Sequence, residues 1–197
     1  THLIMAESSQ AVQDGVQRDQ HYAQALQAAQ DTRTDIGVET QEGIQLRATR
    51  WAIEDRQPAL ALERLDALPQ GTGRRVLALR YRLKAARQLG NTDLALETAR
   101  TLARHKAFTP GAGRVLVGRL IVDQLTAAFD LDQLQRIWMR LDRDERAWPE
   151  VALAAARQLV SNGGTAAQAR AWLLPLWERM AAGEETLSST QRSAIIA

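Results

Sequence analysis

Leu-Ala-Leu-Glu occupies residues 60–63 and again residues 94–97, so the two copies begin 34 residues apart. The correspondence extends beyond these four letters, because the same offset places Arg50 on Lys84. A period of 34 residues is the length of two antiparallel helices with their turns. One such pair leaves an apolar face uncovered, so successive pairs must stack on each other. The spacing therefore predicts a chain built from repeated helix pairs.

This period is that of the tetratricopeptide repeat, and the residue usage agrees with a helical fold. Hydrophobic residues make up 45% of the 197 residues, but aromatic residues make up only 5%. The abundant alanine, leucine, arginine, glutamine and glutamate favour helices, whereas sheets prefer β-branched and aromatic residues. We expect an all-α protein, a right-handed α-α superhelix of about five tetratricopeptide-like antiparallel helix pairs.

Glycine, proline and polar clusters divide the chain into helix pairs. We expect a first pair at residues 1–30, a loop at 31–41, two regular repeat units at 42–110, and two less regular pairs at 111–187. Residues 188–197 look like the start of a further, truncated repeat. We therefore expect the sequence to be a fragment of a longer protein.

Composition disfavours several classes of function. The 25 basic and 23 acidic residues are interspersed and leave a net charge of +2, so we expect no broad basic surface for nucleic acid. The absence of cysteine excludes disulfides, thiolate metal sites and cysteine nucleophiles. No stretch approaches the ~18 apolar residues that a membrane span needs.

The titratable residues do not form a recognisable catalytic pattern. His2, His21 and His105 lie far apart in sequence and share no metal-ligand spacing, so no metal site is expected. The carboxylates within residues 142–145 alternate with arginine and are predicted to form a solvated surface. No nucleophile stands beside a base. We therefore expect neither an enzyme nor a bound cofactor.

Tryptophan is concentrated near the end of the chain. Trp138, Trp148, Trp172 and Trp177 all fall in the last third. We expect the rings of Trp172 and Trp177 to pack between the last helix pairs. An exposed ring would instead be an anchor for a partner.

The candidate binding residues are cations on the first helices of the pairs. In tetratricopeptide arrays these first helices line the concave surface, where Arg80, Lys84 and Arg87 would form one stripe at i, i+4 and i+7. Arg50 and Arg119 would occupy corresponding places in the neighbouring units. Such a groove suits acidic peptide, phosphate or propionate groups, because arginine can hold a carboxylate through two hydrogen bonds.

Two segments resemble the HemY-like proteins of proteobacteria. The first is His-Leu-Ile-Met-Ala-Glu at residues 2–7, continuing through Gly15 to Arg-Asp-Gln-His-Tyr at 18–22. The second is Asp-Gln-Leu-Gln-Arg-Ile-Trp-Met-Arg-Leu at residues 132–141, followed by Pro149 and an alanine-rich helix to Gly163. This resemblance implies an inner-membrane protein with two N-terminal spans outside the present sequence, associated with late haem and porphyrin metabolism. It implies no catalytic residues.

Two functions follow from this resemblance as expectations. The first is a non-catalytic scaffold that docks other proteins, among them enzymes of the haem pathway, at the inner membrane. Its repeats would face the cytoplasm if a basic stretch follows the spans. The alternative is a carrier that binds porphyrin or haem, with arginines holding the propionates in the concave groove.

Overall fold

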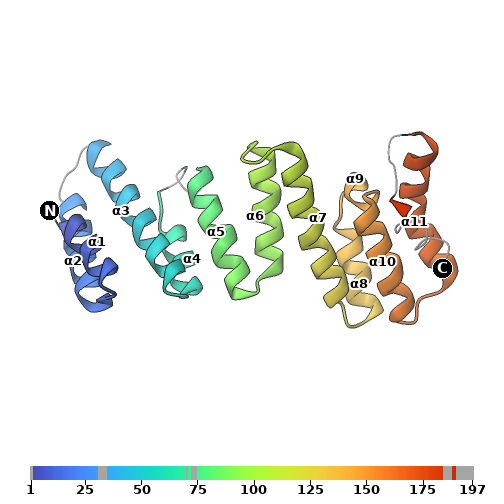
Figure 1. Ribbon diagram of the computed structural model, residues 1–197, viewed down its shortest axis with the longest axis horizontal. Coiled ribbons are helices and arrows are strands. Elements are labelled where there is room, and N and C mark those ends of the chain that lie inside the picture. The colour runs from blue at the N-terminus through green and yellow to red at the C-terminus, as the bar shows by residue number, and fades with distance from the viewer. Residues whose placement is uncertain (1, 31–34, 70, 72–74, 184–187, 190–197) are drawn as a thin grey trace. The chain divides into compact units, whose positions relative to one another are not determined.

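The computed structural model describes residues 2–30, 35–69, 71, 75–183 and 188–189, and the fold of this part of the chain is all-α (Figure 1). Eleven helices lie within the described residues and pack largely in sequential pairs. Their bounds are α1 His2–Ala11, α2 Gly15–Gln30, α3 Asp35–Glu54, α4 Pro58–Asp66, α5 Val76–Leu89, α6 Thr92–Arg104, α7 Pro110–Ala127, α8 Leu131–Met139, α9 Arg143–Arg146, α10 Pro149–Ser161 and α11 Ala166–Ala181.

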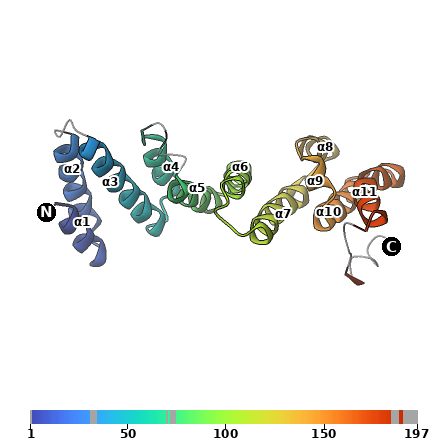
Figure 2. The same ribbon diagram turned by 90° about the horizontal axis from the view of Figure 1, so that it is seen from above.

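The chain divides into two compact units, Thr1–Ala107 and Phe108–Ala197. In the first unit each helix from α1 to α6 contacts the next along the chain, and α3 also contacts α5. Figure 2 shows α5 between α4 and α6. Contact between the first helices of neighbouring pairs, here α3 and α5, is what stacking of helix pairs requires.

The breaks between helices follow local sequence signals. Gly90 ends α5 with a positive φ of 72°, a conformation that glycine adopts at low cost. The next residue, Asn91, begins α6, because its side-chain oxygen accepts a hydrogen bond from the Leu94 N–H at 3.0 Å. These two adjacent residues therefore separate α5 from α6.

Small residues form the centre of the first unit. Ala61 and Ala95, which the 34-residue offset superimposes, are 0% and 1% exposed. Ala61 belongs to a buried cluster with Ala52, Ile53 and Ala85. A methyl side chain allows helix backbones to approach closely at these contacts, and a larger side chain there would overpack the core. The burial of both alanines agrees with the repeat offset.

In the second unit α7 packs against α8 and α10, and α10 packs against α11. The caps agree with the sequence: the Gln133 N–H donates to the Asp130 carboxylate at 2.6 Å, and Thr165 with Gln168 forms a capping box before α11. Gly164 permits the chain to pass close to the end of α10, because a Cβ there would lie 2.8 Å from the Leu159 carbonyl oxygen.

Two expectations differ from the observed helices. The first is the loop at 31–41, since α3 begins at Asp35; residues 31–34 lie outside the described residues. The second is the solvated surface at 142–145, where Asp142 and Asp144 are exposed as expected but Glu145, in the short helix α9, is buried. Glu145 is 6% exposed and its carboxylate accepts a hydrogen bond from the Asp142 N–H at 3.1 Å, closing a capping box. The further repeat expected at 188–197 lies outside the described residues except for 188–189.

Trp172 and Trp177 were both expected to pack between the last helix pairs. Trp172 does so, whereas Trp177 does not. Trp172 of α11 stacks on Trp138 of α8, with ring centroids 4.6 Å apart and an interplanar angle of 10°. Trp177 is instead 59% exposed. A spacing of five residues separates the two side chains by about 140° around the helix axis, so the rings lie on different sides of α11.

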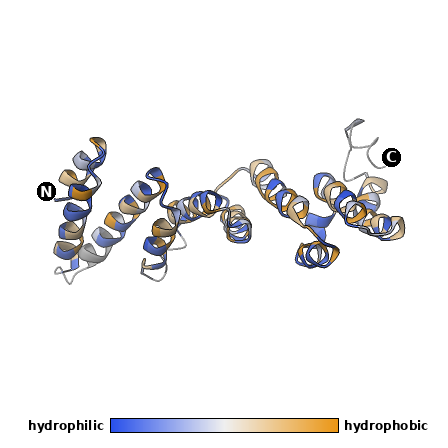
Figure 3. Cartoon of the chain, turned by 90° about the horizontal axis from the view of Figure 1, so that it is seen from below, coloured by the Kyte–Doolittle hydropathy of each residue, from blue (hydrophilic) through white to orange (hydrophobic). Residues whose placement is uncertain are grey.

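Hydrophilic and hydrophobic residues alternate around most helices, as Figure 3 shows by colour. The apolar side of each helix faces its neighbours, so buried residues recur at helical spacing. Among the described residues, none of the helices combines the length and the hydrophobicity that crossing a membrane would require.

Candidate functional site

Three of the five predicted cations lie together on α5. Arg80, Lys84 and Arg87 are all exposed, because Leu79, Leu83 and Ala86 on the other side of the helix are buried. We call these three cations the α5 basic stripe. They border an open pocket of about 370 Å³ whose lining residues are Arg80, Leu83, Lys84, Arg87 and Gln88.

The three cations of the α5 basic stripe differ in whether their charged groups contact other parts of the protein. The Arg80 guanidinium donates a hydrogen bond from Nη2 to the Ala107 carbonyl oxygen at 3.2 Å. Lys84 and Arg87 form no ion pair with any residue in the part of the chain that the structure describes. Their charges therefore remain available to an acidic ligand.

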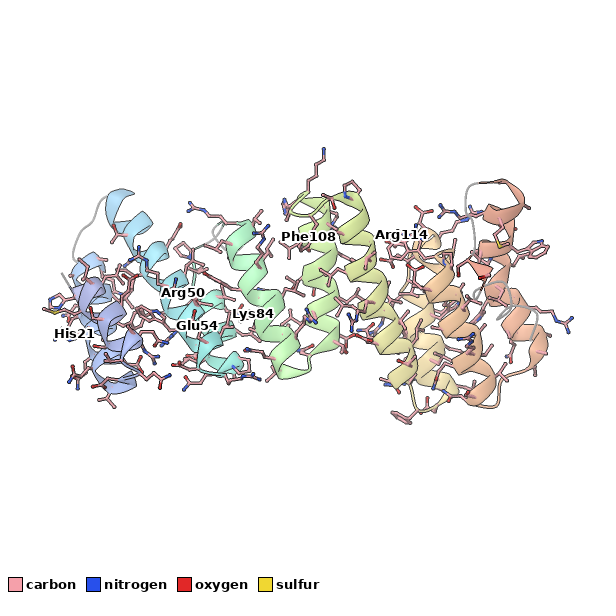
Figure 4. The ribbon with its side chains drawn as sticks, in the orientation of Figure 1. His21, Arg50, Glu54, Lys84, Phe108 and Arg114 are labelled. Carbon is pink, nitrogen blue, oxygen red and sulfur yellow. The ribbon has the colours of Figure 1, made fainter. Side chains whose placement is uncertain are left out.

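Arg50 stands on the neighbouring helix α3 and already has a partner. Its Nε atom lies 3.5 Å from the Glu54 Oε1 atom, and both side chains are about half exposed. Figure 4 labels Arg50, Glu54 and Lys84, which lie on α3 and α5. Because α3 contacts α5, Arg50 belongs to the same region of the first unit, but Glu54 offsets its charge. Sequence reasoning did not consider this pair, although its i, i+4 spacing is a recognised signal.

Arg119 is the fifth predicted cation. It is exposed on α7 and belongs to the second unit, whereas the other four residues belong to the first. The structure thus brings together Arg80, Lys84 and Arg87, and adds Arg50 on the adjacent helix. Arg119 lies in the second unit and is not part of this group of residues.

A cation that sequence reasoning did not single out lies on α7. The Arg114 guanidinium, labelled in Figure 4, is 5.6 Å from the centre of the Trp148 ring and 3.7 Å from a Glu150 carboxylate oxygen. Cation–π contact and ion pairing hold the same guanidinium. The sequence offered no signal for this contact, because Arg114 and Trp148 lie on different helix pairs.

A buried cation in the first unit was also missed. Arg18 is 4% exposed and hydrogen bonds to Gln10, to Asp19 at 2.8 Å and to Asp55, while its guanidinium lies 5.9 Å from the Trp51 ring. Burial lowers the pKa of Arg18, but the hydrogen bonds and charges of Asp19 and Asp55 outweigh burial and raise the pKa. This arginine remains charged and joins α1, α2 and the end of α3. Its role is structural.

Two larger cavities are lined by both charge signs. One of about 870 Å³ in the first unit includes Asp66 and Arg82, paired at 2.5 Å, together with Glu97. One of about 650 Å³ in the second unit lies beside Arg143 and Glu178, which are 4.0 Å apart. Because acids and bases face each other in both cavities, neither offers the single-signed surface of the α5 basic stripe.

The histidines are not all apart in space. The rings of His2 and His21 stack with their centroids 6.3 Å apart, although nineteen positions separate them in sequence. His21 Nδ1 lies 3.4 Å from the Gln24 amide oxygen. Within the described ranges, no group of three or more histidine, aspartate or glutamate side chains is placed to hold a metal ion.

Comparison with known proteins does not extend this description. The chain matches no protein-family model, no curated protein and no solved structure.

Proposed function

We propose that this chain is a non-catalytic scaffold that binds other proteins through a superhelix of tetratricopeptide-like repeats. The proposal is supported by the sequential packing of helix pairs and by the contact between α3 and α5. Burial of Ala61 and Ala95, 34 residues apart, gives a second and independent argument for a structural repeat. Arrays of this kind bind partners on an extended surface rather than in a closed pocket.

The α5 basic stripe is the observation that carries this proposal. Three cations share one exposed face of a first helix, and none of them forms an ion pair with the described residues. A single-signed surface attracts a partner of opposite charge and disfavours like-charged ones. The partner is therefore a protein that presents acidic side chains.

The resemblance to HemY-like proteins suggests where this scaffold acts. We place it at the bacterial inner membrane, attached through segments outside the present sequence, with enzymes of late haem and porphyrin synthesis as partners. Holding such enzymes on one surface raises their local concentration without any chemistry by the scaffold itself. A porphyrin carrier is less well supported, because the pocket at the α5 basic stripe is lined by no aromatic ring among the described residues.

The test is crosslinking of the full-length protein in its own membrane. The variant Arg80→Ala/Lys84→Ala/Arg87→Ala is compared with Arg136→Ala/Arg140→Ala/Arg157→Ala, which removes the same charge from exposed positions of the second unit. Capture of a haem-pathway enzyme should fall at least about tenfold in the first variant and stay near the wild-type level in the control.

Unchanged capture by the α5 variant would contradict the proposal. Stoichiometric absorbance changes on titration with protoporphyrin, lost in the α5 variant, would instead favour the carrier. Because all six substituted residues are exposed, circular dichroism should show that both variants retain the helical content of the wild type.

A further inference from the structure

The exposed face of α5 changes character along its length. Leu77 is 46% exposed and precedes Arg80, Lys84 and Arg87 by three, seven and ten positions. Positions with these separations lie on one side of an α-helix. This face therefore presents an apolar side chain in the first turn of α5, followed by three cations over the next turns.

The charge on this face is not matched from within the described residues. Glu54 lies on the adjacent helix α3, but it pairs with Arg50 at 3.5 Å. Lys84 and Arg87 form no ion pair in the described ranges, and Arg80 contacts a backbone carbonyl rather than a carboxylate. A partner that complements this face therefore presents three acidic groups to the cations and one apolar group to Leu77.

We infer that the occupant is an acidic amphipathic helix of a partner protein, packed antiparallel along α5. This inference rests on the proposed docking function and adds the shape and register of the partner. Along a helix, Arg80, Lys84 and Arg87 are separated by axial rises of about 6.0 and about 4.5 Å. A second helix with acids at intervals of three and four residues repeats these rises, so all three ion pairs form together.

An extended segment does not match this spacing equally well. Its side chains on one face recur about every 6.7 Å, so the third acid falls about 3 Å beyond the third cation. Nucleic acid matches less well again, because a phosphate backbone offers nothing apolar to Leu77. The combination of a helical charge interval and an apolar end favours the acidic helix.

The antiparallel direction follows from the order of residues on α5. In this direction the acids opposite Arg87, Lys84 and Arg80 lie in the first turns of the partner helix, and the apolar residue opposite Leu77 follows them. Carboxylates near a helix N-terminus stabilise the helix through its macrodipole. The acid opposite Arg87, which lies in the first turn of the partner helix, therefore supports both that helix and its contact with α5.

The test uses synthetic peptides and the full chain. The matched peptide is alanine-rich, with glutamate at its second, fifth and ninth positions and leucine at its twelfth. A second peptide of identical composition places the glutamates at alternate positions, and a third reverses the order of the matched peptide. Fluorescence anisotropy measures affinity, and circular dichroism measures the helicity that the peptide gains on binding.

The matched peptide should bind at least about tenfold more tightly than the alternating peptide, because the alternating peptide loses at least one ion pair. The reversed peptide can meet the same four positions only in the parallel direction, where its glutamates lie toward its own C-terminus and oppose the helix macrodipole, so it should bind more weakly than the matched peptide. The matched peptide should gain helicity on binding. Leu77→Ser should remove most of the preference for the matched peptide, and Arg80→Gln/Lys84→Gln/Arg87→Gln should remove binding. The control Arg136→Gln/Arg140→Gln/Arg157→Gln should leave binding unchanged.

Other outcomes overturn the inference in distinguishable ways. If all three peptides bind equally and all depend on the α5 basic stripe, the helical register is wrong while acidic docking stands. If the stripe variant binds every peptide as well as the wild type does, both the register and the proposed docking surface are wrong. Tighter, stripe-dependent binding of a single-stranded RNA oligonucleotide would show that the surface recognises phosphate instead.

Discussion

Tyr22 shows how a single half-buried side chain connects the packing of the first unit to its chemistry. The ring lies beside Leu3, Ala25 and Ala29, and the Arg64 guanidinium is 5.0 Å from its centre. Burial raises the pKa of the Tyr22 hydroxyl above 10.0, the nearby Arg64 charge lowers it, and the net change is upward. The folded protein therefore holds this proton more tightly than the unfolded chain does.

The raised pKa predicts a loss of stability at alkaline pH. A group whose folded-state pKa is raised contributes stability below its unfolded pKa, and this contribution is lost as the pH rises through the folded pKa. The free energy of unfolding should therefore begin to fall near the ordinary tyrosine pKa of about 10 and continue to fall as the pH rises through the higher folded-state pKa. In Tyr22→Phe this fall should be smaller, as measured by urea titration at each pH. An identical pH profile in the variant would show that the pKa of Tyr22 does not differ between the folded and unfolded states.

At the scale of helices, the stacked rings of Trp138 and Trp172 connect α8 to α11. Trp138 is 5% exposed, and the Arg146 guanidinium lies 5.7 Å from its ring while donating to the Trp138 carbonyl oxygen at 3.1 Å. The short helix α9 carries Arg146. One stacked pair and one arginine thus hold three helices of the second unit.

Removal of this stack should destabilise the second unit. Trp172→Ala loses one ring of the stack and should lower the free energy of unfolding by about 2–4 kcal/mol. Trp177→Ala is the matched control, because Trp177 lies on the same helix and is 59% exposed; it should cost less than about 1 kcal/mol. Chemical denaturation monitored by circular dichroism measures both. Equal costs for the two variants would contradict a structural role for the stack.

At the scale of the whole molecule, each compact unit has a core of its own. Trp51 and Ile53 are buried in Thr1–Ala107, while Leu159 and Leu176 are buried in Phe108–Ala197. Because apolar burial drives folding, a unit with its own core can fold without the other. The two units are therefore candidates for independent folding.

Residues 1–107 and 108–197, produced separately, should each be helical and unfold cooperatively. The sum of their circular dichroism spectra should reproduce that of the intact chain, since the described helices lie wholly within one unit or the other. Thermal melting of each half measures cooperativity. If either fragment lacks a helical circular dichroism signal, the core of that unit is not sufficient to fold it by itself.

Contacts within one helix or one turn were predictable because their signals are adjacent in the chain. The Gly90 and Asn91 break, the Asp130 cap and the Thr165 capping box each depend on residues within a single turn. The α5 basic stripe was predictable for the same reason, since helical periodicity alone places its three cations on one face. The repeat offset likewise indicated which alanines are buried.

By itself, the sequence determined the helical class and the common face of Arg80, Lys84 and Arg87. Only the tertiary structure decided which charges are free and which are matched. It buried Arg18 against Asp55, 37 residues away, and placed the Arg114 guanidinium beside Trp148 and Glu150 of another helix pair. The physical reason is range: backbone hydrogen bonds and periodicity act over a few residues, whereas burial and ion pairing depend on which distant helices meet.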